Sequence, residues 1–317
     1  MGDNFQFITK NVPTFYVIGV TTGKSSIMKV FPLWMQVFGR PEVVIEGIDL
    51  KIQDTLEVYR NVIAQIKNDP LSLGALVITH KIDLFNAAHD LFDYLDPDTL
   101  ARGEVASISK HKGKLVGHDI DPISAGLSLE EIIEPGYFKR TGGEVLCFGA
   151  GSSGMAIALH LINKNDKADR PRRYVFSNRS QWRLHQVKEM VNKQKTDIQF
   201  EYICNSVLEI NDQLMKTMPP CSIVINATGM GKDIPGSPVS WRSCFPRGGI
   251  AWEINYRGDL DFLHQAEAQI ANQNLKVKDG WGYFLHGWTQ VISKALNITL
   301  TPKLFRELAE AAETVRK

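Results

Sequence analysis

The sequence predicts an α/β protein with two domains and mainly parallel sheets. Strand-like apolar runs alternate with runs of helical spacing from end to end, a pattern typical of parallel sheets covered by helices. A length of 317 residues exceeds one small core and suits two domains. Near the middle, a glycine-rich turn at residues 149–154 stands between a predicted strand and a predicted helix. We expect the second domain to begin just before this turn, near Gly143.

The first part of the chain contains three predicted strands and a predicted hairpin. The strands are residues 15–20, 43–50 and 75–78, the hairpin pairs 104–109 with 114–118, and helical spacing appears around 31–38, 56–66 and 128–133. Pro135-Gly136 then favours a turn and marks a boundary.

The second part contains five more predicted strands, at residues 145–148, 174–177, 200–204, 222–226 and 249–254. A helix-like run, residues 155–161, follows the glycine turn. No strand follows the last two predicted helices, residues 283–296 and 302–315. We therefore expect those two helices to return and cover the first domain.

Composition argues for a globular enzyme without nucleic-acid or membrane partners. The formal net charge is +1, which gives no electrostatic attraction for nucleic acid or an anionic bilayer, and no apolar run is long enough to cross one. The four cysteines are widely spaced and form no CxxC pair, so we expect no metal and a reducing, cytoplasmic location. Cys147 and Cys204 lie in strand-like runs and are expected to be buried. The sequence leaves a homodimer open.

The glycine turn has the features of a dinucleotide-binding site. Gly149 permits the tight turn, Gly151 lets the backbone approach a pyrophosphate, and Gly154 lets the helix pack on the strand. Ser152 and Ser153 open the helix, whose N-terminal N–H groups then face the anion. The alternative is an ordinary glycine turn without a ligand.

The residues after the next predicted strand indicate which dinucleotide. An NAD site carries a ribose-binding Asp or Glu about 20–25 residues after the glycines, and none stands there. The chain instead has Asn178, Arg179, Ser180 and Arg183. Guanidinium groups form paired bonds to phosphate oxygens, so these residues favour NADP, with its 2′-phosphate, over NAD. The alternative is that both arginines belong to a solvated helix face.

Two residues near predicted strand ends are candidates for proton transfer. Lys81 follows the third predicted strand and Asp121 follows the hairpin. A Lys ammonium can hydrogen-bond a reacting carbonyl oxygen while a carboxylate fixes its position. Spacing alone supports this pairing weakly, because most Lys and Asp residues are solvated.

Ordered short segments resemble the motifs of the shikimate dehydrogenase family over about residues 15–296. The family's Ser-x-Ser-Pro turn resembles residues 24–28, N-V-T-x-P-x-K resembles 75–81, G-A-V-N-T resembles 103–107, and G-x-N-T-D resembles 117–121. Its glycine turn resembles 149–154, N-R-T-x-x-R resembles 178–183, N-A-T-S-x-G-M resembles 226–231, D-x-x-Y resembles 253–256, and D-G-x-x-M-L-x-x-Q resembles 279–287.

The resemblance implies that one domain binds the substrate and the other binds the cofactor. Residues 1–121 and 281–317 would form the substrate-binding and catalytic domain, and 122–280 a Rossmann-type NADP-binding domain. Lys81 and Asp121 become the catalytic pair, and Thr228 and Met230 are expected to approach the cofactor. The predicted substrate-binding residues are Lys24, Ser25, Thr79, Tyr256 and His286. A solvated Lys24 and a packed His286 are the alternatives for those two positions.

The departures from the family pattern concern substrate recognition. Ser25 lacks a second serine two positions away, and Ala75, Ala106 and Asp119 replace asparagines. A site that loses groups bonded to substrate hydroxyls changes its substrate. We therefore expect an NADP-dependent oxidoreductase acting on a secondary alcohol or ketone of a small polar, cyclic polyol or hydroxy acid other than shikimate. The alternatives are a shikimate or quinate dehydrogenase and a non-catalytic NADP-binding sensor.

Overall fold

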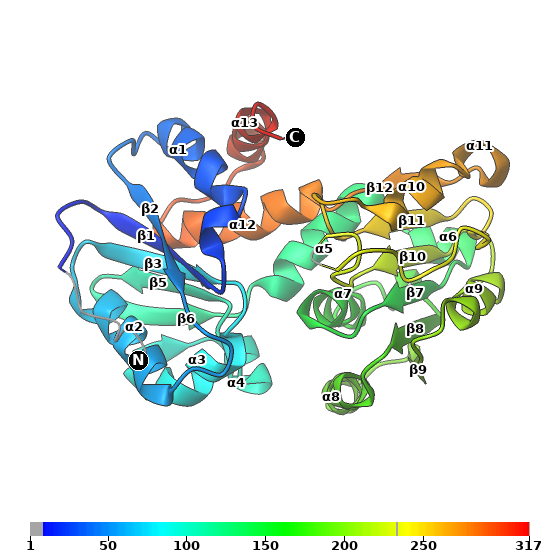
Figure 1. The fold of residues 1–317 in the computed structure, drawn as a ribbon, viewed down its shortest axis with the longest axis horizontal. Coiled ribbons are helices and arrows are strands. Elements are labelled where there is room, and N and C mark those ends of the chain that lie inside the picture. Colours follow the sequence, from blue (N-terminus) through cyan, green and yellow to red (C-terminus); the bar gives the residue numbers. More distant parts are fainter. Residues whose placement is uncertain (1–8, 233, 317) are drawn as a thin grey trace. The chain divides into compact units, whose positions relative to one another are not determined.

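The computed structural model describes residues 9–232 and 234–316. They divide into two compact units (Figure 1). The first runs to Ile120 and resumes at Gly287, and the second is Asp121–His286. Each unit has its own six-stranded sheet. The chain is thus an α/β protein, as its alternating pattern predicts.

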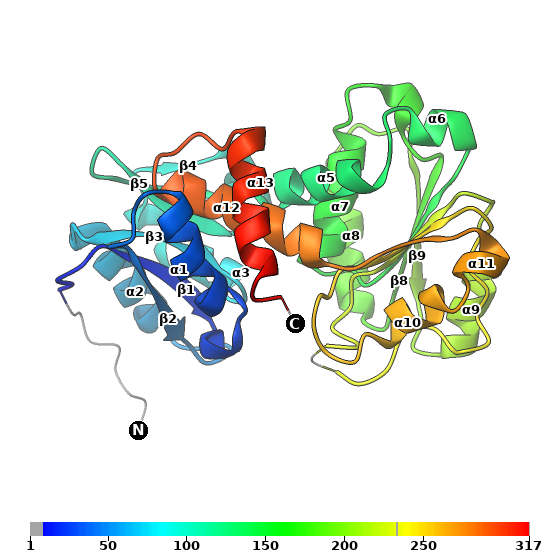
Figure 2. The same cartoon turned by 90° about the horizontal axis from the view of Figure 1, so that it is seen from above.

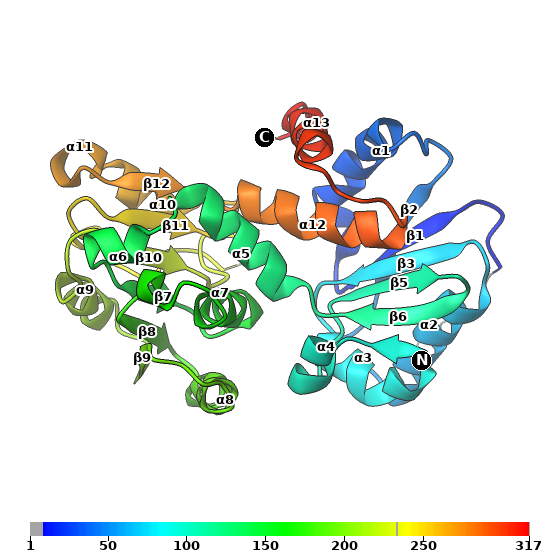
Figure 3. The ribbon, with the colours of Figure 1, turned by 180° about the vertical axis from the view of Figure 1, so that it is seen from behind.

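The first unit is built on a mixed sheet with the order β2-β1-β3-β5-β6-β4 (Figure 3). Its strands are β1 (Thr14–Gly19), β2 (Val44–Asp49), β3 (Ser72–Val77), β4 (Tyr94–Leu95), β5 (Ser107–His111) and β6 (Lys114–His118). β1 lies parallel to β2 and β3, whereas the β5–β6 hairpin adds antiparallel pairs. Every residue of β1 is buried, so this central strand is covered on both faces.

Helices cover both faces of this sheet. They are α1 (Ile27–Val37), α2 (Leu56–Asn68), α3 (Lys81–Ala88), α4 (Pro97–Arg102) and α13 (Pro302–Glu313), with short 3₁₀ turns η1 (Thr22–Lys24) and η2 (His89–Leu91). Tyr16 and Ile18 pack with α2 and α3. Phe15, which alternates with them, stacks on Phe31 of α1 on the other face.

The C-terminal helix α13 lies beside α1, although more than 260 residues separate them (Figure 2). The Trp34 indole N–H donates to the Leu308 carbonyl oxygen at 2.7 Å. The two preceding elements of the chain, β12 (Lys276–Lys278) and α12 (Trp281–Ala295), belong wholly or in part to the second unit. The expected return of the last helix to the first domain is confirmed.

The second unit contains a fully parallel sheet with the order β12-β11-β10-β7-β8-β9. Besides β12, its strands are β7 (Val145–Phe148), β8 (Arg173–Asn178), β9 (Gln199–Cys204), β10 (Ile223–Asn226) and β11 (Ile250–Glu253). All four residues of β7, β10 and β11 are buried. Such short, continuously apolar strands are typical of a parallel sheet with two covered faces.

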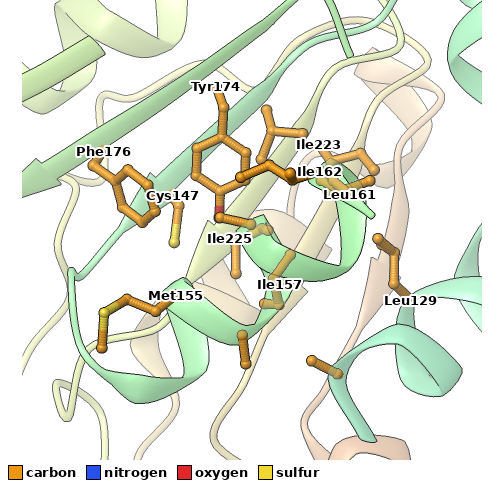
Figure 4. Close-up of a cluster of buried hydrophobic side chains, with 14 of the residues drawn as sticks. Leu129, Cys147, Met155, Ile157, Leu161, Ile162, Tyr174, Phe176, Ile223 and Ile225 are labelled. Atoms are coloured by element: carbon orange, nitrogen blue, oxygen red, sulfur yellow. The ribbon is translucent and has the colours of Figure 1, made fainter. Parts of the chain in front are cut away.

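Alternating side chains of these strands form two cores. Val145, Cys147, Tyr174 and Phe176 face α5 (Asp121–Ile132), α7 (Ser152–Ile162) and α8 (Gln181–Asn192), as Figure 4 shows for part of this cluster. Leu146, Phe148 and Val175 face α9 (Leu208–Lys216) and α10 (Asp261–Glu267). The remaining elements are α6 (Tyr137–Thr141), η3 (Lys167–Asp169) and α11 (Ile270–Gln273).

Three features differ from expectation. β4 and β12 are two and three residues long, too short for a periodic signal, and the sequence did not predict them. β5 begins at Ser107 rather than at residue 104. Cys147 is buried as expected, but Cys204 is exposed, because β9 is an edge strand with only one neighbour.

Within the described residues, no helix combines the length and apolar character that a bilayer span requires.

The packing of α13 on α1 yields a stability prediction. Leu308 is fully buried. We expect Leu308→Ala to lower the free energy of unfolding by about 2–5 kcal/mol, since it leaves a cavity. Urea titration followed by tryptophan fluorescence measures this, with Glu310→Ala on the exposed side of the same helix as control. Equal midpoints for the two variants would contradict the packing described.

Candidate functional site

The strand order of the second unit reverses at β7. The chain proceeds from β7 outward through β8 and β9, then returns to β10 on the other side of β7. Ligands of open parallel sheets bind at the carboxyl ends of strands where the order reverses in this way. The turns after β7 and β10 meet at this point, since the Ala227 N–H donates to the Phe148 carbonyl oxygen at 2.8 Å.

The first of these turns requires glycine at two positions for steric reasons. Gly149 has φ +108°, and a Cβ there would lie 2.5 Å from the Ala227 carbonyl oxygen. A Cβ on Gly154 would lie 2.7 Å from the Gly149 carbonyl oxygen. Glycine, which has no Cβ, is therefore the residue that lets β7, α7 and the turn after β10 approach so closely.

Gly151 differs, because a Cβ there would meet nothing within 4 Å. Because Gly151 has no Cβ, the space beside the start of α7 stays open. Gly151 is the N-cap of α7 and, having no side chain, makes no cap bond to the N–H groups of the first turn. Ser152 and Ser153 are partly exposed at this start. An uncapped helix start below an open backbone suits an anionic ligand.

The end of β8 presents positive charge and no acid. Asn178 is its last residue, and Ser180 caps α8 by accepting from the Arg183 N–H at 3.3 Å. Arg179 and Arg183 are exposed, and neither forms an ion pair with an acidic residue of the described chain. The Arg183 guanidinium lies 4.8 Å from the ring centre of the exposed Trp182. The Arg183 guanidinium also donates from Nη1 to Gln186 Oε1 at 3.2 Å, which leaves both arginines exposed and without an acidic partner among the described residues.

The turn after β10 holds the two residues expected to approach the cofactor. The Thr228 hydroxyl donates to Asn226 Oδ1 at 2.6 Å and accepts from the Met230 N–H at 3.1 Å. Asn255, beyond the end of β11, donates from Nδ2 to the carbonyl oxygens of Thr228 and Met230 at 3.0 and 3.2 Å. The turn is thus held at several points.

In the first unit, Lys24 and Ser25 lie in the turn between β1 and α1. Lys24 is exposed and Ser25 is partly exposed. The turn is tied to β2, because the Thr22 N–H and hydroxyl both donate to Asp49 Oδ1, at 2.8 and 2.6 Å. Gly47 makes room, since a Cβ there would overlap the Thr22 hydroxyl. Sequence patterns did not single out Asp49 or Thr22, which are far apart in the chain.

Lys81 is the first residue of α3, just beyond β3, and is partly exposed, while Thr79 is exposed. His80 is buried and its Nδ1 lies 3.1 Å from the Tyr59 hydroxyl. The Lys81 carbonyl oxygen accepts from the Val105 N–H at 3.1 Å, which joins this turn to the segment before β5. The backbone at Lys81 is therefore tied to the segment that precedes β5.

Asp121 is the first residue of α5 and thus of the second unit. Its neighbour Asp119 is buried and receives a hydrogen bond from Arg102 Nη1 at 2.7 Å, while Arg102 Nη2 donates to Glu104 at 2.9 Å. The extra acid at position 119 is therefore compensated by a buried guanidinium, which the sequence analysis did not predict.

Tyr256 and His286 occupy different surroundings in the second unit. The Tyr256 ring packs on Trp281 and Phe284 of α12, with ring centres 5.6 and 4.8 Å away. His286 is buried, and its Nε2 lies 2.9 Å from Glu131 Oε1 on α5. Its ring nitrogen is thus directed at a carboxylate of the same unit.

The comparisons with known proteins agree with this fold. No protein-family model matches the chain. It is 25% identical over 180 residues to the NADP⁺-dependent shikimate dehydrogenase of Lactococcus lactis, across 56% of this chain and 59% of that protein. The chain spans only 30–62% of the length of the curated relatives it matches, which are all shikimate dehydrogenases.

Solved structures match over a greater length. A shikimate dehydrogenase in complex with NADP⁺ superposes with a TM-score of 0.72 at 20% identity, covering 98% of both chains. A ligand-free 5-ketofructose reductase of Gluconobacter superposes with a TM-score of 0.70 at 19% identity, covering 96% of this chain and 99% of the other. At these identities the likeness concerns the fold.

The glycine turn yields a prediction that separates two of its positions. Gly149→Ala combines a positive φ with a backbone clash, so we expect it to lower the free energy of unfolding by about 2 kcal/mol or more. Gly151→Ala enters open space and is expected to leave the apo protein within about 0.5 kcal/mol of wild type. Thermal unfolding of both variants without ligand tests this. The reverse order of stability would contradict the geometry.

Proposed function

We propose that this chain, a divergent relative of the shikimate dehydrogenases, is an NADP-dependent oxidoreductase that acts on a secondary alcohol or ketone of a small polar substrate. One observation carries the proposal. An open glycine turn lies where the strand order reverses, and two exposed arginines without an acidic partner among the described residues, Arg179 and Arg183, follow the end of the adjoining strand β8.

In this proposal the second unit binds the dinucleotide. The N–H groups at the start of α7, with Gly151, Ser152 and Ser153, hold the pyrophosphate. Asn178, Ser180, Arg179 and Arg183 hold the 2′-phosphate, and the missing carboxylate removes a group that would repel it. Thr228 and Met230 meet the nicotinamide end.

Proton transfer falls to Lys81 and Asp121. When bound, the cofactor supplies the hydride acceptor or donor. The Lys81 ammonium hydrogen-bonds the reacting oxygen and holds the proton there, and the Asp121 carboxylate orients it. Support comes from the position of each residue, where a helix starts beyond a strand, and from the family motifs each one matches.

The substrate-binding residues implied by the family resemblance are Lys24, Ser25 and Thr79 in the first unit and Tyr256 and His286 in the second. Lys24 and Ser25 lie in a turn held by Asp49 and can meet an anionic or hydroxyl group. Alanine at positions 75 and 106 removes two amides of the family pattern. Losing such groups shifts substrate preference away from shikimate. The likeness to a 5-ketofructose reductase supports a keto sugar or polyol as the substrate class.

Replacing the arginines tests the cofactor assignment. Each charge-assisted bond to phosphate contributes about 1.5–3 kcal/mol, so Arg179→Ala or Arg183→Ala should raise the dissociation constant for NADPH about 10- to 100-fold. The constant for NADH should barely change, because NADH has no 2′-phosphate. Isothermal titration calorimetry measures both.

Arg172→Ala is the matched control, because it removes the same charge just before β8, at the opposite end of that strand. Equal losses for NADPH and NADH in the Arg179 and Arg183 variants would refute the 2′-phosphate assignment. A similar loss in the Arg172 variant would point to a general charge effect.

Replacing Lys81 tests the catalytic assignment. A general acid–base group contributes about 10²- to 10⁴-fold in rate. We therefore expect Lys81→Ala to lower kcat by that factor while NADPH affinity stays unchanged, and Lys114→Ala, at the start of β6, to lower neither. A Lys81 variant with wild-type turnover would exclude this role, and a wild type that binds NADPH without turnover of any substrate would favour a nucleotide sensor.

A further inference from the structure

A buried carboxylate, Glu253, stands beside the turn that holds Thr228 and Met230. It is the last residue of β11, directly opposite Asn226 at the end of β10 in the parallel register. Neither side chain is exposed to solvent. A buried charge on a short parallel strand costs free energy unless hydrogen bonds compensate it, so its presence needs a physical reason.

Three N–H donors surround this carboxylate. Asn226 Nδ2 donates to Oε2 at 2.6 Å, and the N–H and Nδ2 of Asn255 donate to Oε1 at 2.8 and 2.6 Å. Both carboxylate oxygens therefore act as acceptors. This pattern fits the ionised form, which has no proton to place between donors.

The orientation of both amides is set by backbone groups. Asn226 Oδ1 accepts from the Thr228 N–H at 3.1 Å, so its Nδ2 must face Glu253. Asn255 Nδ2 donates to the carbonyl oxygens of Thr228 and Met230. Neither amide can rotate by 180° without losing a bond to this turn. The carboxylate, the two amides and the turn thus form one connected network.

We propose that Glu253 is a positioning residue of the cofactor site, whose carboxylate fixes the Thr228–Met230 turn, through Asn226 and Asn255, in the conformation that receives the nicotinamide end of the dinucleotide. The inference rests on the proposed function, since it assigns this turn to the cofactor. Glu253 itself touches neither cofactor nor substrate.

Glutamine at this position isolates the contribution of the second acceptor. Its amide has the shape of the carboxylate but only one oxygen. If the glutamine oxygen faces Asn255, the glutamine NH₂ group faces the Nδ2 donor of Asn226. If the glutamine oxygen faces Asn226, the NH₂ group faces the two donors of Asn255. The first orientation loses the bond from Asn226, and the second loses both bonds from Asn255, while the packing volume is kept in either case.

The network also predicts a dependence on pH. Burial raises the pKa of Glu253 to about 7, with the charge of Asp279 adding to the rise and the bonds from Asn255 and Asn226 opposing it. Protonation removes one acceptor, as glutamine does. The difference in NADPH affinity between wild type and Glu253→Gln should therefore be largest above pH 7. It should disappear below pH 7. Comparing the two proteins cancels the titration of the cofactor's own phosphate.

Hydrogen exchange of the apo protein tests the network without any nucleotide. In Glu253→Gln, amide exchange at residues 228–231 should accelerate about tenfold, while residues in α7 keep wild-type rates. Asp212→Asn is the matched control, because Asp212 is also buried but accepts from Ser240, outside this network. Unchanged exchange at 228–231, or equal acceleration throughout the domain, would overturn the inference.

NADPH binding completes the test. Calorimetry at pH 8 should show an affinity about tenfold weaker in Glu253→Gln, a gap that closes at pH 6, and no change in Asp212→Asn. If Glu253→Gln fails to fold, Glu253→Asp keeps two acceptors one methylene further away and should give intermediate values. Equal affinities in the variants and wild type overturn this inference alone. A wild type that binds no NADPH overturns the proposed function as well.

Discussion

The close approach of two turns at the centre of the second sheet is the constraint on which the candidate site depends. β7 and β10 are neighbours, and Gly149 lies so near Ala227 that neither turn tolerates a side chain between them. This contact places the start of α7 beside the Thr228–Met230 turn. A pyrophosphate at the first and a nicotinamide at the second would then belong to one extended molecule, which is the geometry that a dinucleotide requires.

The two ends of this edge use different chemistry. At β8, exposed arginines offer charge to a ligand from a solvated surface, where long side chains can adjust to a phosphate. At β10 and β11 the polar groups are buried and satisfy one another, so the turn is held before any ligand arrives. In the proposed function, affinity for a phosphate and placement of the reacting ring would thus come from separate groups. Such preorganisation lowers the ordering cost of binding.

Local patterns were sufficient for the long-range architecture but not for its buried polar network. The glycine turn, the arginines after β8 and the returning helix α13 were all predicted, because each has a periodic or short-range signal. Asn226, Glu253 and Asn255 escaped notice as a group, since their bonds join residues 27 positions apart. The compensation of Asp119 by Arg102 was missed for the same reason. Cys204 was predicted to be buried because its strand has an apolar sequence, but the strand lies at the edge of the sheet and leaves Cys204 exposed. Local sequence does not reveal how many neighbours a strand has.

Reduction of NADP⁺ by the purified protein, followed by absorbance across shikimate, quinate, cyclitols and sugar acids with NAD⁺ in parallel, tests the central claim most directly. The account predicts turnover with NADP⁺ preferred, and a polyol or sugar derivative better than shikimate. Efficient turnover of shikimate would show that the altered residues of the first unit are compensated. Preference for NAD⁺, or neither turnover nor binding of NADP⁺, would contradict the account.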